Sequence, residues 1–326
     1  MTFEKVNYTY EVVEGWGRGE DGFELGVVLG VATDSENRVY VCQRDATPID
    51  LGYDPDRHFT PGVAIFDQRG RFLTFWGDEL FPGSDGLGAP HGIWISAEEK
   101  VYIADKGNHT VRIFTVEGKL LQTIGLPNQP SDTGYDGKNR NSITRSAPPF
   151  NQPTAAMKGP SGAIYVSDGY GNARIHKFSP EGELILSWGE PGKGPGQFDL
   201  PHHVWVDNEE NVYVADRMNH RIQIFDGEGR FITQWTNITR PQEIFIDSED
   251  MVFVTETAQR ITIMRKDDTV LTRWGEKGTE PGQFCHNTHA MCQDSHGDLY
   301  IAVGRAVNDL QKFTRNTKNQ SWQSQT

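Results

Sequence analysis

The segment Ile164-Tyr165-Val166-Ser167-Asp168 is one copy of a short strand pattern in which an aromatic residue stands between aliphatic ones. Before each copy come an apolar pair and a turn rich in Asp, Glu, Ser, Asn or Gly. The six aromatic anchors, spaced 40 to 63 residues apart, are Tyr40, Tyr102, Tyr165, Tyr213, Phe253 and Tyr300. Blades of four strands repeat about every 40–50 residues, so six anchors predict an all-β fold, a six-bladed β-propeller.

The two ends of the chain predict how the ring closes. After the last anchor come one more strand pattern, residues 309–313, and a polar tail, residues 314–326, without a fourth strand. Residues 10–17 have the pattern of a fourth strand, including its final Trp-Gly. We therefore expect the N-terminal strand to complete the last blade, which removes free sheet edges, and a single propeller domain to span residues 1–326.

Composition excludes some partners. Thirty-one Lys and Arg against 45 Asp and Glu leave a formal charge of −14, which argues against nucleic acid or an anionic membrane as the main partner. The sequence has no signal-peptide pattern and no apolar run of the roughly 18 residues that a spanning helix needs. Three cysteines without a disulfide framework favour a cytoplasmic location. The oligomeric state has no signal in the sequence.

The position eleven residues before each anchor separates the blades into two kinds. We expect it at the entry to the innermost strand, which lines the central channel. In blade order its residues are Leu29, His91, Thr154, His202, Gln242 and His289. Alternate blades thus aim three imidazoles at one point, and three histidines with an open fourth position are typical of catalytic zinc. We predict Zn²⁺, or another divalent transition metal, on His91, His202 and His289.

The other histidines are weaker candidates. His203 and His286 lie next to the predicted site but are out of register with the repeat. The remaining five, including His176, are interpreted as loop or surface residues.

Polar residues just after the anchors fall into two groups. Asp105, Asp168, Asp216 and Glu256 recur three residues after an anchor, which indicates turn architecture rather than chemistry. Residues that break the repeat are candidates for function, because an arginine can hold an oxyanion or a carboxylate and a tyrosine near a metal can transfer a proton. We predict Tyr170 and Arg44 as catalytic residues. The candidate pocket residues are Arg217, Arg305 and Asn287.

The chain resembles NHL-type six-bladed propellers, and most of all the peptidyl-α-hydroxyglycine α-amidating lyase family. Residues 164–175 (IYVSDGYGNARI) are similar to the family segment with the catalytic tyrosine, which corresponds to Tyr170. The dipeptides Pro90-His91, Pro201-His202 and Thr288-His289 are similar to its three zinc-ligand segments. Gln43-Arg44-Asp45 looks like the segment with its active-site arginine, Arg44.

The resemblance implies a reaction. The family cleaves the C–N bond of a carbinolamide, R-CO-NH-CH(OH)-R′, into an amide and an aldehyde. It implies that zinc lowers the pKa of the substrate hydroxyl, that Tyr170 handles a proton and that Arg44 supports the developing charge. We expect a small-molecule or short peptide-like substrate, for this reaction or for a related elimination or hydration of an α-hydroxy compound.

Three residues depart from the family pattern. Ala290 stands where the family has an acidic calcium ligand, so the resemblance does not extend to a structural Ca²⁺. Asn287 replaces a methionine, and Gly171 replaces a cysteine.

Two other functions remain open from the sequence. One is a metal-dependent hydrolase of the lactonase type, whose propeller sites gather Asp, Asn and Glu. The other is a non-enzymatic NHL propeller that binds a protein partner. In each case the long loops, residues 45–61 and 126–152, are expected to determine specificity.

Overall fold

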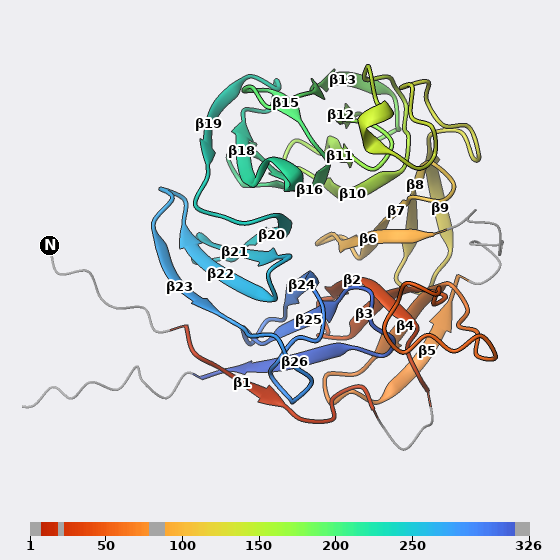
Figure 1. The fold of residues 1–326 in the computed structure, drawn as a ribbon, viewed down its shortest axis with the longest axis vertical. Coiled ribbons are helices and arrows are strands. Elements are labelled where there is room, and N and C mark those ends of the chain that lie inside the picture. Colours follow the sequence, from red (N-terminus) through yellow and green to blue (C-terminus); the bar gives the residue numbers. More distant parts are fainter. Residues whose placement is uncertain (1–7, 19–22, 78–88, 317–326) are drawn as a thin grey trace, which may run out of the picture.

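The computed structural model describes residues 8–18, 23–77 and 89–316. These residues form six four-stranded antiparallel sheets around a common centre, with one strand of each sheet innermost (Figure 1). The predicted six-bladed β-propeller is confirmed. The described part contains no helix long and apolar enough to span a membrane.

In blades 1 to 5 the strands follow one another along the chain from the innermost strand outward. Blade 1 comprises β2 (Val27–Thr33), β3 (Val39–Arg44), β4 (Gly62–Phe66) and β5 (Phe72–Trp76). Blade 2 comprises β6 (Pro90–Ile95), β7 (Lys100–Asp105), β8 (Thr110–Thr115) and β9 (Leu120–Ile124). Blade 3 comprises β10 (Pro153–Lys158), β11 (Ile164–Asp168), β12 (Arg174–Phe178) and β13 (Leu184–Trp188).

The second half of the ring repeats this order. Two short strands, β14 (Glu190–Pro191) and β15 (Gln197–Phe198), pair in parallel ahead of blade 4. Blade 4 comprises β16 (Pro201–Val206), β17 (Val212–Asp216), β18 (Arg221–Phe225) and β19 (Phe231–Trp235). Blade 5 comprises β20 (Pro241–Ile246), β21 (Met251–Glu256), β22 (Arg260–Arg265) and β23 (Val270–Trp274).

Blade 6 joins the two ends of the chain, as predicted. It contains β24 (Thr288–Gln293), β25 (Leu299–Val303) and β26 (Leu310–Arg315), and its outer strand is β1 (Tyr10–Val13). β1 pairs antiparallel with β26, with Tyr10 opposite Arg315 and Val13 opposite Lys312. The polar tail predicted from residue 314 starts too early, because β26 continues to Arg315 opposite β1. Residues 317–326 of that tail lie outside the described residues.

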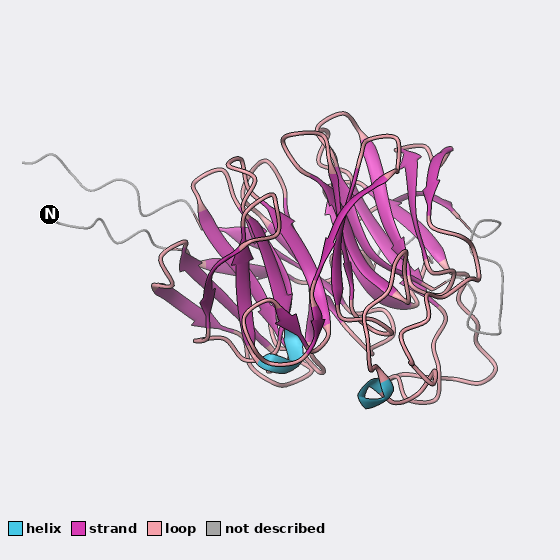
Figure 2. Ribbon diagram, turned by 90° about the horizontal axis from the view of Figure 1, so that it is seen from above, coloured by secondary structure: helices cyan, strands magenta, loops and turns pink. Residues whose placement is uncertain are grey.

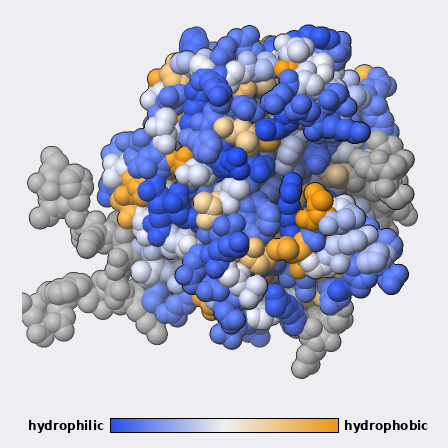
Figure 3. Space-filling view, viewed as in Figure 1, coloured by the Kyte–Doolittle hydropathy of each residue, from blue (hydrophilic) through white to orange (hydrophobic). Residues whose placement is uncertain are grey.

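The hydrophobic core lies between neighbouring blades. One cluster contains Tyr40 and Ile65 of blade 1 together with Ile93 and Phe114 of blade 2. The anchor Tyr40 is only 1% exposed. Burying one large side chain of this kind stabilises the fold by about 1.5–3 kcal/mol. The anchors recur once per blade because each blade buries its anchor against a neighbouring blade. The surface seen in Figure 3 is mostly hydrophilic, with small separate apolar patches.

The carboxylates that follow the anchors fix the backbone just before the innermost strands. The Asp168 carboxylate accepts hydrogen bonds from the backbone N–H of Asn151, and Asp216 accepts one from Asp199. Both acidic side chains are fully buried. Buried carboxylates that accept backbone N–H groups of a neighbouring loop are structural, as the repeat predicted.

Both long segments are loops, as predicted, and the second contains one turn of 3-10 helix, η1 (Arg140–Ser142). A second such turn, η2 (Arg217–Asn219), follows β17. Both turns lie on the same side of the propeller in Figure 2. Since Arg217 begins η2, the loop of residues 126–152 is on the side of the molecule that carries this candidate residue.

Candidate metal centre

The three predicted histidines meet at the centre of the ring. His91, His202 and His289 lie near the starts of the innermost strands β6, β16 and β24. Their ring centroids are 4.9 to 5.1 Å apart, and one ligand nitrogen from each lies within 4.8 Å of the others. All three side chains are buried. Repeat register alone therefore brings together three imidazoles from residues up to 198 positions apart in the sequence.

The second nitrogen of each imidazole is held by the next blade. Nδ1 of His91 lies 2.8 Å from the carbonyl oxygen of Thr154, and Nδ1 of His202 lies 2.8 Å from that of Gln242. Nδ1 of His289 lies 2.9 Å from the carbonyl oxygen of Leu29. A carbonyl oxygen can only accept, so each Nδ1 carries the proton and each Nε2 presents a lone pair to the centre. This arrangement is the usual outer support of a metal-binding histidine.

The surroundings keep these imidazoles neutral. Burial, and then the neighbouring His289 imidazole and Lys106 ammonium, lowers the pKa of His91 well below 6.5. Burial and the charge of Arg217 do the same for the pKa of His202 and lower the pKa of His289 to about 3. Neutral imidazole is the form that binds a metal ion. The three residues therefore fit a divalent transition metal such as Zn²⁺.

Tyr170 lies beside this group. Its phenolic oxygen is 3.2 Å from Nε2 of His91 and 3.1 Å from Nε2 of His202. One O–H group can donate to only one of these lone pairs at a time. The centre thus has more nitrogen lone pairs than protons to share among them, and a bound cation would satisfy the lone pairs that remain.

The loop of residues 126–152 holds the Tyr170 turn in place. The N–H of Gly171 donates to the carbonyl oxygen of Asn151, and the Thr133 hydroxyl donates to the carbonyl oxygen of Gly171. A Cβ at residue 171 would come within 2.1 Å of Oδ1 and 2.9 Å of the carbonyl oxygen of Asn151. This close approach explains why residue 171 is a glycine.

Arg44 ends β3 and is fixed by a salt bridge. Its Nη1 and Nη2 atoms donate to the two carboxylate oxygens of Asp50, both at 2.8 Å. Burial opposes ionisation of Asp50, but the hydrogen bonds from Arg44 and Thr47 hold the pKa of this carboxyl below its ordinary value. Arg44 is close enough to the centre for its charge to lower the pKa of His289. Its side chain is 20% exposed, so it remains reachable by a substrate.

The three candidate pocket residues, Arg217, Arg305 and Asn287, differ in their burial and in their distance from the histidines. Burial lowers the pKa of Arg217, whereas the phenol of Tyr170 beside it raises the pKa. Arg305 is exposed in the connection after β25. Asn287 is buried, and both its Nδ2 atom and His289 crowd Gly304, where a Cβ would come within 3.0 Å of each. Arg217 thus belongs to the Tyr170 environment, and Asn287 lies against the third histidine.

The sequence reasoning did not single out Lys106. Its Nζ lies 4.6 Å from the centroid of the Tyr170 ring. A signal was present, because Lys106 stands four residues after its anchor, like Arg44 and Arg217 after theirs. Basic residues at this position of blades 1, 2 and 4 converge on the centre.

The channel contains a second polar pair. Nε2 of His203 lies 3.8 Å from Oε1 of Glu243, on neighbouring innermost strands. Burial lowers the pKa of His203 to about 3 and raises the pKa of Glu243 well above 4.5. These residues line a cavity of about 360 Å³ that does not include the three central histidines.

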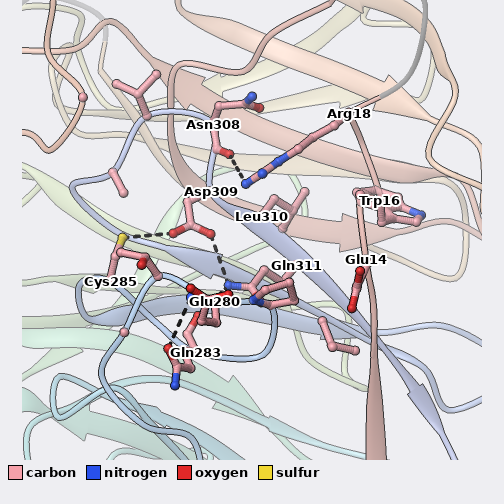
Figure 4. Close-up of a pocket in the computed structure, with 18 of the residues that line it drawn as sticks. Glu14, Trp16, Arg18, Glu280, Gln283, Cys285, Asn308, Asp309, Leu310 and Gln311 are labelled. Atoms are coloured by element: carbon pink, nitrogen blue, oxygen red, sulfur yellow. Dashed lines mark hydrogen bonds between the residues drawn. The ribbon is translucent and has the colours of Figure 1, made fainter.

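Two further features lie outside the site. The placement predicted for His176 is wrong, because this residue lies in β12, is fully buried and contacts the Ser187 hydroxyl at 2.8 Å. A cavity of about 470 Å³ lies at the closing blade, where the Cys285 thiol donates to Asp309 (Figure 4). This cavity is not lined by the three central histidines, nor by the basic side chains of Arg44, Lys106 and Arg217.

Comparison with known proteins agrees with this architecture. A family model described as a 6-bladed beta-propeller matches residues 155–262. NHL repeat-containing protein 3 of Homo sapiens is 32% identical over 72% of this chain and 61% of its own length. The chain is an NHL-repeat six-bladed β-propeller. It spans about three fifths of the length of that human protein.

The propeller also has homologues among lyases. A probable peptidyl-alpha-hydroxyglycine alpha-amidating lyase of Caenorhabditis elegans is 25% identical over 86% of this chain and 80% of its own length. Peptidyl-glycine alpha-amidating monooxygenase of Mus musculus is 34% identical over 61% of this chain but only 20% of its own length. A streptogramin B lyase structure has a TM-score of 0.60 at 14% identity, covering 97% of this chain and 100% of that one, which shows a shared fold.

Proposed function

We propose that this propeller is a zinc-dependent lyase that cleaves the C–N bond of an α-hydroxylated amide to an amide and an aldehyde. The observation that carries the proposal is the position of the Tyr170 phenol, 3.2 and 3.1 Å from Nε2 of His91 and His202. A proton-transfer group thus lies directly against the atoms that would hold a metal. Homology to amidating lyases supports the same reaction class.

His91, His202 and His289 would hold the metal through Nε2, with the fourth position open to the substrate. When bound there, Zn²⁺ supplies a Lewis acid that lowers the pKa of the substrate hydroxyl. The carbonyl oxygens behind the three imidazoles keep the Nε2 atoms unprotonated and aimed at the centre.

Tyr170 moves the proton. Cleavage of R-CO-NH-CH(OH)-R′ requires one proton to leave the hydroxyl oxygen and one to reach the amide nitrogen, while the C–N electrons depart with nitrogen and the C–O bond becomes a carbonyl. The phenol can donate its proton to the amide nitrogen, and the phenolate so formed can accept the proton from the hydroxyl oxygen, so one side chain performs both steps and returns to its starting state. The guanidinium of Arg217 lies beside the Tyr170 oxygen, and its positive charge faces the negative charge that this oxygen carries between the two steps.

Arg44 orients the substrate and offsets the negative charge that develops on it. Its bidentate contact with Asp50 fixes the guanidinium, and its partial exposure leaves donor atoms for a ligand. A fixed cation next to the reacting centre stabilises negative charge that develops on the aldehyde fragment. The substrate class we propose is a small or short peptide-like carbinolamide. The charge of −14 leads us to expect neither nucleic acid nor a membrane as partner.

A lactonase-type site is less well supported. Such sites use carboxylate and amide oxygens, whereas Asp168 and Asp216 accept hydrogen bonds from backbone N–H groups at the blade entries. A protein-binding platform without chemistry does not require three neutral imidazoles at its centre. Replacement of His202 with alanine distinguishes the platform from the enzyme, because only the enzyme depends on this residue.

The direct test is product formation. Purified zinc-loaded protein is incubated with an N-acyl-α-hydroxyglycine, and amide and glyoxylate are measured together. The proposal expects equal amounts of the two products, formed faster than in buffer containing the same zinc concentration. Rates equal to that buffer for peptide-like and small acyl groups alike would refute it.

A further inference from the structure

Lys106 has no acidic partner in the described part of the chain. It follows β7 directly and is partly exposed, with its Nζ above the Tyr170 ring. The Tyr170 oxygen in turn touches two of the three central imidazoles. The lysine amine therefore lies one aromatic ring away from the candidate metal centre.

Two other lysines show what is unusual here. Lys177 lies 5.5 Å from the Tyr165 ring centroid and pairs with Glu228 at 3.5 Å. Lys312 lies 5.2 Å from the Tyr300 ring centroid and pairs with Asp298 at 3.0 Å. Each of these ammonium groups has a carboxylate to keep it charged. Lys106 occupies the same kind of position over a ring but faces other cations instead.

Burial, followed by the positive charges of Arg44 and Arg305, lowers the pKa of Lys106 from 10.5 to about 8. Near pH 7.5 a group with such a pKa is neutral roughly 200-fold more often than an ordinary lysine. A lysine that is desolvated and next to other cations is the usual form of a nucleophilic amine that attacks carbonyls.

We propose that Lys106 reversibly captures the aldehyde released at the metal centre as an imine. The Nζ lone pair adds to the aldehyde carbon, the resulting carbinolamine loses its hydroxyl as water, and the C=N bond replaces C=O. No oxidant or reductant is needed, and hydrolysis returns the amine and the aldehyde. The capture restrains turnover when product accumulates. Only the source of the aldehyde rests on the proposed function, since added aldehyde can reach Lys106 without lyase activity.

The test traps the imine by reduction. Full-length protein is treated with glyoxylate and cyanoborohydride at pH 7.5, and peptide mass spectrometry measures carboxymethylation of each lysine. We expect modification of Lys106 to exceed that of any other lysine by about tenfold or more, because of its larger neutral fraction. K106R keeps the positive charge but cannot form the imine, and its labelling at this peptide should vanish. K177R is the matched control and should label Lys106 like the original protein.

Two outcomes would overturn the proposal. One is labelling spread evenly over exposed lysines with Lys106 no higher than the rest. The other is equal total labelling in K106R and the original protein. The Y170F variant separates this proposal from the lyase, because it should lose lyase activity and still be labelled at Lys106. Labelling without any lyase activity in the original protein would refute the enzyme and leave the capture site intact.

Discussion

Nδ1 of His202 lies 2.8 Å from the carbonyl oxygen of Gln242, and both residues occupy the same position of the repeat in neighbouring blades. The other two histidines are held in the same way by Thr154 and Leu29. One repeat position thus performs two tasks. In even blades its side chain presents a lone pair to the centre, and in odd blades its backbone carbonyl fixes the tautomer of the neighbour.

Replacing His202 with alanine should abolish stoichiometric metal binding. Two imidazoles remain, and loss of a direct ligand should reduce affinity by more than the roughly 10–100-fold seen on loss of an outer-shell partner. Metal content after dialysis, measured by elemental analysis, checks this. H58A is the control, because the His58 side chain is 78% exposed and away from the centre. Unchanged metal content in H202A would contradict the assignment.

Replacing Tyr170 with phenylalanine removes one oxygen and leaves the ring. We expect kcat to fall by about 10²–10⁴-fold, the usual contribution of a positioned acid or base, while metal content stays the same. Assays on a hydroxyglycine substrate together with elemental analysis check both parts. A normal kcat would remove the proton-transfer role from this residue.

Replacing Gly171 with cysteine should destabilise the fold. The new Cβ would meet Asn151, whose side chain is itself held by a hydrogen bond to the Ser131 carbonyl. Overpacking of this kind costs about 1–3 kcal/mol. Urea denaturation measures the change, with G194C as the control, because the backbone of Gly194 suits any residue and the nearest atom to a Cβ there is the end of the flexible Gln197 side chain, at 3.1 Å. Equal stabilities of the two variants would show that the Asn151 loop yields.

Replacing Asp50 with asparagine should loosen Arg44 without touching the histidines. The substitution removes the negative charge that faces a half-buried guanidinium, and we expect a loss of about 2–3 kcal/mol of stability. KM for the hydroxyglycine substrate should rise more than metal affinity falls. A variant with unchanged thermal stability and KM would show that Arg44 needs no such support.

The free energy of unfolding of the metal-free protein should fall as pH decreases below 6.5. His203 has a native pKa of about 3, so between pH 6.5 and 3 the unfolded chain binds a proton that the native state does not. That difference costs about 1.4 kcal/mol per pH unit. H203Q should therefore show a shallower pH slope than the original protein. Glu243 is present in both proteins, so its opposite contribution largely cancels, and identical slopes would contradict the neutral buried imidazole.

Much of the fold follows from local pattern. The aromatic anchors mark the second strand of every blade because each large ring must be buried between two sheets, and Tyr40, Tyr165 and Tyr300 are almost completely buried. The tail boundary could not be read in the same way. Thr314 and Arg315 are polar, and only pairing with β1 makes them strand.

His176 shows a different limit. A histidine within a strand pattern reads as a surface residue, yet here it is buried beside Ser187 and Asp168. Whether a polar residue is exposed depends on which partner the neighbouring strand places opposite it, and that pairing is a tertiary property.

The sequence by itself determined the ring, its closure and the convergence of His91, His202 and His289, because a repeat transfers one local register to every blade. Only the tertiary structure decided what surrounds them. Lys106 became a candidate because Tyr170, Arg44 and Arg305, from three other blades, lie around it. The charge state of a group depends on burial and on charges distant in sequence, so no local pattern could specify it.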